Sequence, residues 1–242
     1  MEQQSESNQS KNWYPRTIFN RSYHNYAVVV MARSIYWEPR KMFEIWKEAV
    51  LTVTVNGGIY SWIQYLENAG IDIFSGQYNE YVPKIIIAKR MDRSIHAPLT
   101  MIDKLKSLGS RVIYLPGQNR KEFTRTLNCI ADFAHDSNMT LRDMYAFAES
   151  EANFHNVQVI ETLRVSDGNI RNIEIVIVSS FYFCWMLRHG LHKIRVENGV
   201  DKNMVITICS FLPFNSCVVN NLTTTGLQTN FSMYHTFNLS HL

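Results

Sequence analysis

The apolar positions between residues 20 and 150 follow two alternating periods. Short runs rich in Val and Ile, typical of buried strands, alternate with longer segments in which apolar residues recur every three or four positions, as on one face of a helix. The pattern predicts strands at Tyr26–Ala32, Val50–Val55, Lys84–Lys89, Arg111–Leu115 and Met139–Leu141. It predicts helices at Pro39–Ala49, Ile59–Asn68, Pro98–Leu108 and Arg120–His135, followed by a turn or helix at Asp143–Glu149. Such alternation predicts right-handed βαβ units, and therefore a three-layer α/β fold in which helices cover both faces of a parallel sheet.

The first apolar run, Tyr26–Ala32, is continuous, and it ends abruptly at the polar residues Arg33 and Ser34. An unbroken apolar run is typical of a strand that is buried on both faces, at the centre of a parallel sheet. Ligands of open α/β sheets bind beyond the carboxyl ends of the strands. Ser34 is therefore a candidate nucleophile, and the alternative that it is a strand-end polar residue or a helix cap stays open.

The last third of the chain has a different composition, because residues 203–242 contain no Asp, Glu, Lys or Arg. This segment adds edge strands such as Met204–Phe211, is poorly ordered, or is not a selected protein segment at all, and composition does not decide between these alternatives. Without charged residues it is also prone to aggregate if exposed. We expect a disordered tail at residues 1–12, an α/β domain at 13–160 and a C-terminal extension at 161–242.

Charge and composition exclude several classes of function. The 24 Lys and Arg residues nearly balance the 21 Asp and Glu residues and form no basic block, which gives no indication of nucleic acid as a partner. The four cysteines lack CxxC spacing, so no metal is expected; a disulfide between Cys209 and Cys217 stays an open alternative. Asn56-Gly57-Gly58 has neither the GxGxxG pattern nor the lysine of a phosphate-binding loop, so a nucleotide enzyme is not expected.

No targeting or membrane segment is visible in the sequence. The polar N-terminus has no apolar core of a signal peptide, so a cytoplasmic location is expected by default. The apolar run Ile175–Leu187 is shorter than the roughly 20 residues that span a bilayer. The oligomeric state is not indicated.

The order of polar blocks along the chain resembles that of the SGNH (GDSL-type) hydrolases and their PC-esterase-like relatives. Ser34 follows the first strand, Asn56-Gly57-Gly58 the second and Lys89-Arg90-Met91-Asp92 the third. Residues 123–155 look like the closing segment of that family, in which a long helix and a short strand precede an Asp and a His, here Asp143 and His155. The resemblance covers roughly residues 26–156.

The resemblance implies a flavodoxin-like sheet and a cofactor-free serine esterase that acts on a small ester or acylated substrate. Ser34 would attack the ester carbonyl, His155 would accept its proton, and Asp143 would orient His155. Gly58 and a residue of the third block would donate hydrogen bonds to the oxyanion. Asp92 occupies that block, and an ionised carboxylate cannot donate such a bond.

Two departures from the family pattern keep other hypotheses open. Ala32 and Arg33 stand where the family has Gly-Asp, and the third block lacks its Gly-x-Asn. A non-catalytic relative that uses the old cleft for binding, and an unrelated α/β binding module, are therefore the alternatives. The separate residues also have structural interpretations: a turn at Gly57 and Gly58, a cap or a pair with Arg90 or Arg93 for Asp92, the start of a helical turn for Asp143, and a surface or packing role for His155. His96 is an alternative base.

Overall fold

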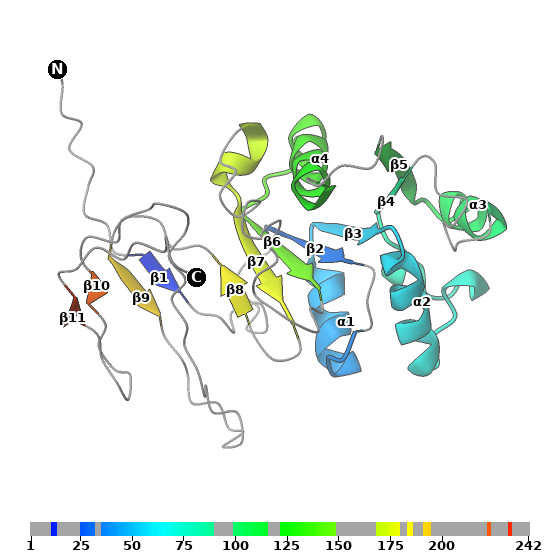
Figure 1. Ribbon diagram of the computed structural model, residues 1–242. Coiled ribbons are helices and arrows are strands. Elements are labelled where there is room, and N and C mark those ends of the chain that lie inside the picture. The colour runs from blue at the N-terminus through cyan, green and yellow to red at the C-terminus, as the bar shows by residue number, and fades with distance from the viewer. Residues whose placement is uncertain are drawn as a thin grey trace, which may run out of the picture. The chain divides into compact units, whose positions relative to one another are not determined.

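A computed structural model describes residues 11–13, 25–31, 35–89, 99–115, 122–148, 168–179, 183–185, 191–194, 222–223 and 232–233. The helices are α1 (Pro39–Glu48), α2 (Gly58–Asn68), α3 (Leu99–Ser107) and α4 (Glu122–Asp136), with short 3-10 turns η2 (Ile73–Ser75), η3 (Asn79–Tyr81) and η4 (Gly168–Asn172). The main sheet contains β2 (Tyr26–Val30), β3 (Leu51–Val55), β4 (Ile85–Lys89), β5 (Arg111–Leu115), β6 (Asp143–Phe147), β7 (Glu174–Val178) and β8 (Phe183–Trp185). Figure 1 shows these elements along the chain.

The seven strands lie in the order β5-β4-β3-β2-β6-β7-β8. Every neighbouring pair is parallel except β7 and β8, which are antiparallel. The predicted α/β class with a mostly parallel sheet is confirmed. The order itself differs from the 2-1-3-4-5 arrangement of a flavodoxin-like sheet, because three successive strands lie on one side of the first strand before the chain crosses to the other side.

Strand β2 is the centre of this sheet, as the unbroken apolar run predicts. It pairs with β3 on one side and with β6 on the other, and all five of its residues are buried. Strand β3 is buried along its whole length as well. Side chains on both faces of these strands are removed from water, which explains why their sequences are apolar without alternation.

The helices cover the two faces as right-handed crossovers require. The connections β2–α1–β3, β3–α2–β4 and β4–α3–β5 all step in one direction, so their helices pack on one face, with Met42, Trp62 and Leu105 in the same apolar cluster. The connection from β5 through α4 to β6 steps back in the other direction. Helix α4 and η4 therefore pack on the opposite face, and Figure 1 shows α4 above the sheet and α1 and α2 below it.

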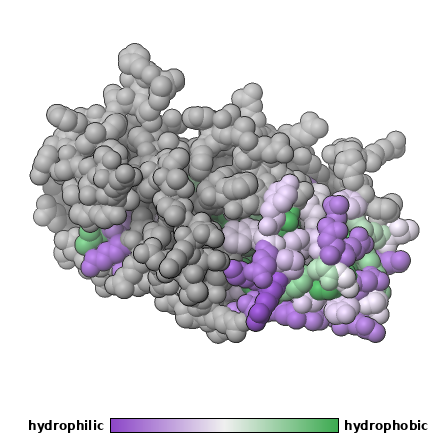
Figure 2. Space-filling model, turned by 90° about the horizontal axis from the view of Figure 1, so that it is seen from below, coloured by the Kyte–Doolittle hydropathy of each residue, from purple (hydrophilic) through white to green (hydrophobic). Residues whose placement is uncertain are grey.

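The face below the sheet has an aromatic core between α1 and α2. The rings of Trp46 and Trp62 stack with their centroids 3.8 Å apart, and the indole N–H of Trp62 donates a hydrogen bond of 2.8 Å to the carbonyl oxygen of Tyr81. Phe43 packs edge-on against Trp62. These contacts fix α1 and α2 relative to the strands whose ends they connect. Seen from below, the described surface over these helices carries hydrophilic residues around smaller apolar patches (Figure 2).

Three features of the fold differ from the sequence-based expectation. The predicted strand Met139–Leu141 is wrong, because the fifth strand of the βα series is β6 at Asp143–Phe147, where a turn or helix was expected. Strands β7 and β8 continue the sheet beyond residue 160, where the domain was expected to end. Lys11 and Asn12, expected in a disordered tail, belong to β1 (Lys11–Trp13), which pairs in parallel with β9 (His192–Ile194).

The chain divides into two compact units, Met1–Val196 and Glu197–Leu242. In the second unit, β10 (Leu222–Thr223) and β11 (Ser232–Met233) form an antiparallel pair. The expected strand Met204–Phe211 and the Cys209–Cys217 pair lie outside the described residues. Within the part of the chain that the structure describes, no helix combines the length and the apolar character needed to cross a bilayer.

Candidate functional site

The strand order creates a topological switch point beside β2. The chain leaves β2 towards β3 on one side, and it returns from β5 to the other side as β6. In open α/β sheets, ligands bind beyond the carboxyl ends of the strands at such a point, because the diverging connections leave space between them. The carboxyl ends of β2, β3 and β6 therefore mark the candidate site.

The turn Asn56-Gly57-Gly58 lies at this edge, directly after β3. Asn56 adopts a positive φ of 49°, which asparagine tolerates better than most residues, and its backbone N–H donates a 2.7 Å hydrogen bond to the carbonyl oxygen of Ile87. This bond continues the pairing of β3 with β4, and the chain then turns into α2 within two residues. Helix α2 consequently begins at the carboxyl edge of the sheet.

Gly58 allows the first turn of α2 to lie against the end of β2. A β-carbon at this position would overlap with the carbonyl oxygen of Val30 and would lie 2.9 Å from the Val30 carbonyl carbon. Backbone atoms cannot rotate away as a flexible side chain can, so only glycine fits here. Because Gly58 has no side chain, α2 can begin directly after β3 and lie against β2 at the switch point.

The amino end of α2 offers backbone N–H groups at this edge. The first N–H groups of a helix have no partner within the helix, and the helix dipole places a partial positive charge there. The capping residue, Gly57, has no side chain that could accept a hydrogen bond from them. A helix end of this kind favours an anion such as a phosphate group.

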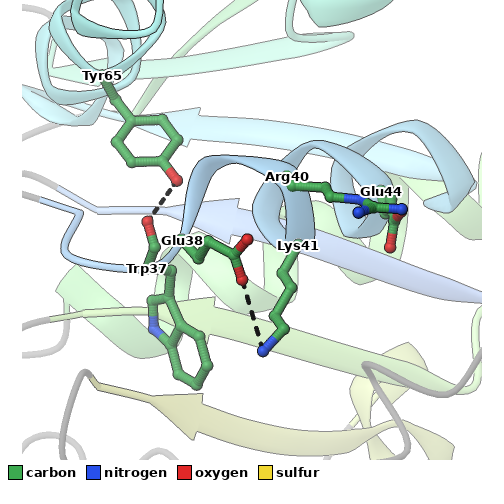
Figure 3. A network of polar contacts seen from close by, with 6 residues as sticks. All are labelled: Trp37, Glu38, Arg40, Lys41, Glu44 and Tyr65. Carbon is green, nitrogen blue, oxygen red and sulfur yellow. Dashed lines mark hydrogen bonds and ion pairs between the residues drawn. The ribbon is translucent and has the colours of Figure 1, made fainter.

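The loop between β2 and α1 is anchored beside the same edge. The hydroxyl group of Tyr65 donates a 2.6 Å hydrogen bond to the carbonyl oxygen of Trp37, and the Trp37 ring packs edge-on against Phe147 at the end of β6. Figure 3 shows Tyr65 reaching from α2 towards this loop, with the ion pair between Lys41 and Glu38 close by. Tyr36, which precedes the anchored Trp37, is 69% exposed. The loop therefore displays an aromatic ring near the switch point.

The structure describes two of the five candidate site residues taken from the esterase resemblance. Ser34, Asp92 and His155 lie outside the described residues. Gly58 lies at the carboxyl edge of the sheet, whereas Asp143 is the first residue of β6 and pairs in register with Tyr26, the first residue of β2. Four residues of extended chain, about 13 Å, separate that position from the carboxyl edge. Gly58 and Asp143 are therefore not brought together.

Asp143 instead lies beside two tyrosines, the buried Tyr26 and the partly buried Tyr145. The rings of Tyr26 and Tyr145 meet edge-on at 5.6 Å, and the Tyr26 hydroxyl donates a 2.8 Å hydrogen bond to the carbonyl oxygen of Ile45. Burial raises the pKa of Tyr145, and the negative charge of Asp143 raises it further. Asp143 therefore lies at the amino edge of the sheet, at the start of β6 and close to the Tyr145 ring.

Metal-binding residues are sparse in the described part of the chain. No group of three or more His, Cys, Asp or Glu residues there is arranged to hold a metal ion. Cys129 and Cys184 are free thiols, and burial raises the pKa of both. These two thiols are therefore protonated and unreactive at neutral pH.

Known structures with a similar fold are thiamin pyrophosphokinases. Thiamin pyrophosphokinase from Candida albicans superposes with a TM-score of 0.55 and 16% identity, over 76% of this chain and 66% of that chain. Yeast thiamin pyrophosphokinase superposes with a TM-score of 0.54 and 14% identity, over 74% of this chain and 67% of that chain. No protein-family model matches the sequence. At this level of identity the similarity shows a shared fold, and this chain spans about two thirds of each of those proteins.

These neighbours correct the sequence-based interpretation of family and function. The resemblance to SGNH hydrolases is wrong, and so are the esterase activity and the non-catalytic SGNH relative that followed from it. The neighbouring structures are transferases.

The sequence contained a signal for this site that motif matching does not use. A pair of glycines stands directly between a fully buried strand and a helix whose first residues are apolar. A turn at this place would require only one flexible residue. Two successive glycines at the carboxyl end of a central strand indicate, in addition, a close backbone approach of the kind found at Val30.

Proposed function

We propose that this protein is a pyrophosphoryl-transferring enzyme of the thiamin pyrophosphokinase type, and that the amino end of α2 holds phosphate groups of the donor. The observation that carries the proposal is the α2 end itself, which Gly58 brings against the end of β2 at the switch point. The shared fold with two thiamin pyrophosphokinases supports the choice of reaction.

Pyrophosphoryl transfer requires a site that binds the negatively charged phosphate groups of the donor and offsets their charge. Backbone N–H groups at a helix end meet this need, since they donate hydrogen bonds to phosphate oxygens and carry a partial positive charge. Gly57 adopts φ −65° and ψ −9°, a conformation open to any residue, so its backbone does not require glycine. The absence of a side chain there is consistent with a ligand that approaches the backbone closely.

Activity is tested directly with the full-length protein, thiamin and the magnesium salt of ATP. We expect thiamin pyrophosphate to accumulate with time and with enzyme concentration, as measured by chromatography with fluorescence detection. A purified, folded protein that forms no thiamin pyrophosphate at high enzyme concentration would contradict the proposed reaction.

The phosphate site is tested by a matched pair of substitutions at Gly57. Gly57→Asp places a carboxylate at the amino end of α2, where it suits the helix dipole but repels phosphate. Gly57→Asn adds a side chain of nearly the same shape without the charge. We expect Gly57→Asp to weaken ATP binding at least about tenfold more than Gly57→Asn, which corresponds to about 1.4 kcal/mol. Equal affinities of the two variants, measured by isothermal titration calorimetry, would remove α2 from the site.

A further inference from the structure

A cavity lies at the amino edge of the sheet, opposite the edge at which α2 begins. It is a groove of about 320 Å³ between the ends of α1 and α3 and the segment that leads into β4. Its walls include Thr52 near the start of β3 and Lys84 just before β4, so it lies at the amino edge of these strands. The volume is at the lower end of the range for small-molecule sites, about 300–1,000 Å³.

The polar side chains of this groove include two lysines, and the others are Thr52, Asn79 and Glu80. The Lys84 ammonium donates a 2.7 Å hydrogen bond to the carbonyl oxygen of Val50 and has further N–H donors to offer. The Lys47 ammonium lies 3.3 Å from the Glu80 carboxylate and 4.7 Å from the centre of the Tyr81 ring. Two lysines against one glutamate leave the groove with a net positive charge.

The contact between Lys47 and Glu80 indicates which chemical group the groove accepts. Hydrogen bonding to Tyr81 and to Glu80 raises the pKa of Lys47, although partial burial opposes this shift, so the amine is charged at neutral pH. The carboxylate of Glu80 already forms an ion pair with this ammonium. Both side chains are about half exposed, at 45% and 46%, which leaves them free to exchange one partner for another.

The remaining wall of the groove is apolar. Leu108 is half-buried and provides the accessible part of this wall, whereas Trp46, Val82 and Pro83 also line it but are buried. An organic anion would cover Leu108, which an inorganic anion would leave in contact with water. The ligand that matches both parts has a carboxylate group and a small apolar body.

We propose that this groove binds small organic carboxylates, which pair with Lys84 and displace Glu80 from Lys47. The site is independent of the one proposed for pyrophosphoryl transfer, since it lies at the other edge of the sheet. Glu80 acts as a built-in competitor that lowers the affinity of the groove for external carboxylates.

If Glu80 competes with the ligand for Lys47, removing its charge should strengthen ligand binding, which a nonspecific surface would not show. Phenylacetate is the probe, and its binding to the full-length protein is measured by calorimetry or by ligand-observed NMR. We expect Glu80→Gln to tighten binding about threefold or more, and Lys84→Met to weaken it about fivefold or more, as loss of a charge-assisted hydrogen bond requires. Phenylacetamide, which lacks the negative charge, is expected not to bind.

The Lys41–Glu38 pair provides the matched control. It is also an exposed ion pair, at 3.5 Å, between the capping residue of α1 and its first turn (Figure 3). Neither residue lines the groove. Glu38→Gln and Lys41→Met should leave phenylacetate binding unchanged, and thermal unfolding checks that all variants are folded. The proposal is overturned if the wild-type protein does not bind phenylacetate, if phenylacetamide binds equally well, or if Glu80→Gln and Lys84→Met behave like the control variants.

Discussion

Gly58 is the residue at which the backbone geometry of the switch point depends on a single missing atom. A methyl group there would overlap with the backbone of Val30, and neither backbone can yield without moving α2 or β2. We expect Gly58→Ala to lower the free energy of unfolding by about 2–3 kcal/mol, as overpacking of a rigid core does. Urea denaturation followed by circular dichroism measures the change.

Gly70 provides a control with a different physical origin. Its φ of +76° disfavours alanine, but a β-carbon there would meet no atom within 4 Å. Gly70→Ala should therefore cost only about 1 kcal/mol of conformational strain. If both variants lose the same stability, steric contact with Val30 is not what requires glycine at position 58.

Stability depends on pH in the alkaline range because of two tyrosines at the amino edge, the buried Tyr26 and the partly buried Tyr145. Burial raises the pKa of Tyr26 and of Tyr145 above the ordinary value of 10.0. Their stabilising contribution is fully present below pH 10, and it is lost above pH 10 because the unfolded chain gives up these protons more readily than the folded chain.

We expect the free energy of unfolding to fall above pH 10 by up to about 1.4 kcal/mol per pH unit for each such tyrosine. Urea denaturation at a series of pH values from 8 to 11 measures the slope. Tyr145→Phe should make the curve flatter in this range while leaving its shape near pH 8 unchanged. An unchanged slope in Tyr145→Phe would show that Tyr145 ionises equally in both states.

At the scale of elements, local signals in the sequence predicted most helices and strands. Pro39 at the first position of α1, the apolar face of Met42, Ile45 and Trp46, and the β-branched run of β3 all act within a few residues. Strand β5 was predicted with its observed bounds, Arg111–Leu115. These elements form where periodicity and propensity agree, so the sequence alone locates them.

Strand β6 could not be located in this way, because its position depends on partners distant in the chain. The segment Asp143–Phe147 contains Met and Ala, which also suit a helix, and an acidic residue at its start. It becomes a strand because it fills the place between β2 and β7, with Ala27 paired to Met144 on one side and Ile175 paired to the same residue on the other. Tertiary pairing overrides local preference here.

The candidate site shows the same division between local and distant information. The Asn56–Gly58 turn was visible as a break between a strand and a helix. Its place at a switch point depended on the order of seven strands, which no short motif contains. The order of polar blocks that suggested an esterase follows from strand–loop–helix alternation, and this alternation is common to many α/β folds.

At the scale of the whole molecule, the sheet needs strands that lie beyond the expected boundary at residue 160. Strand β7 pairs along its full length with β6 and buries Ile175, Ile177 and Val178. Burial of such side chains contributes about 1.5–3 kcal/mol each. Their sum is a large part of the roughly 5–15 kcal/mol by which a domain is stable. We therefore infer that the α/β domain extends beyond residue 160, to the division near Val196.

Two truncated proteins test this boundary. A chain of residues 1–196 keeps every strand of the main sheet, and we expect it to unfold cooperatively in urea with a midpoint close to that of the full-length protein. It should also be more soluble, because the segment 203–242, which contains no charged residue, is removed. A chain of residues 1–160 lacks β7 and β8 and exposes the edge of β6, so we expect it to aggregate or to lose cooperative unfolding. If the shorter chain folds cooperatively, β2–β6 and their helices are sufficient for a stable domain. Residues 13–160 would then form the domain without the contacts of β7.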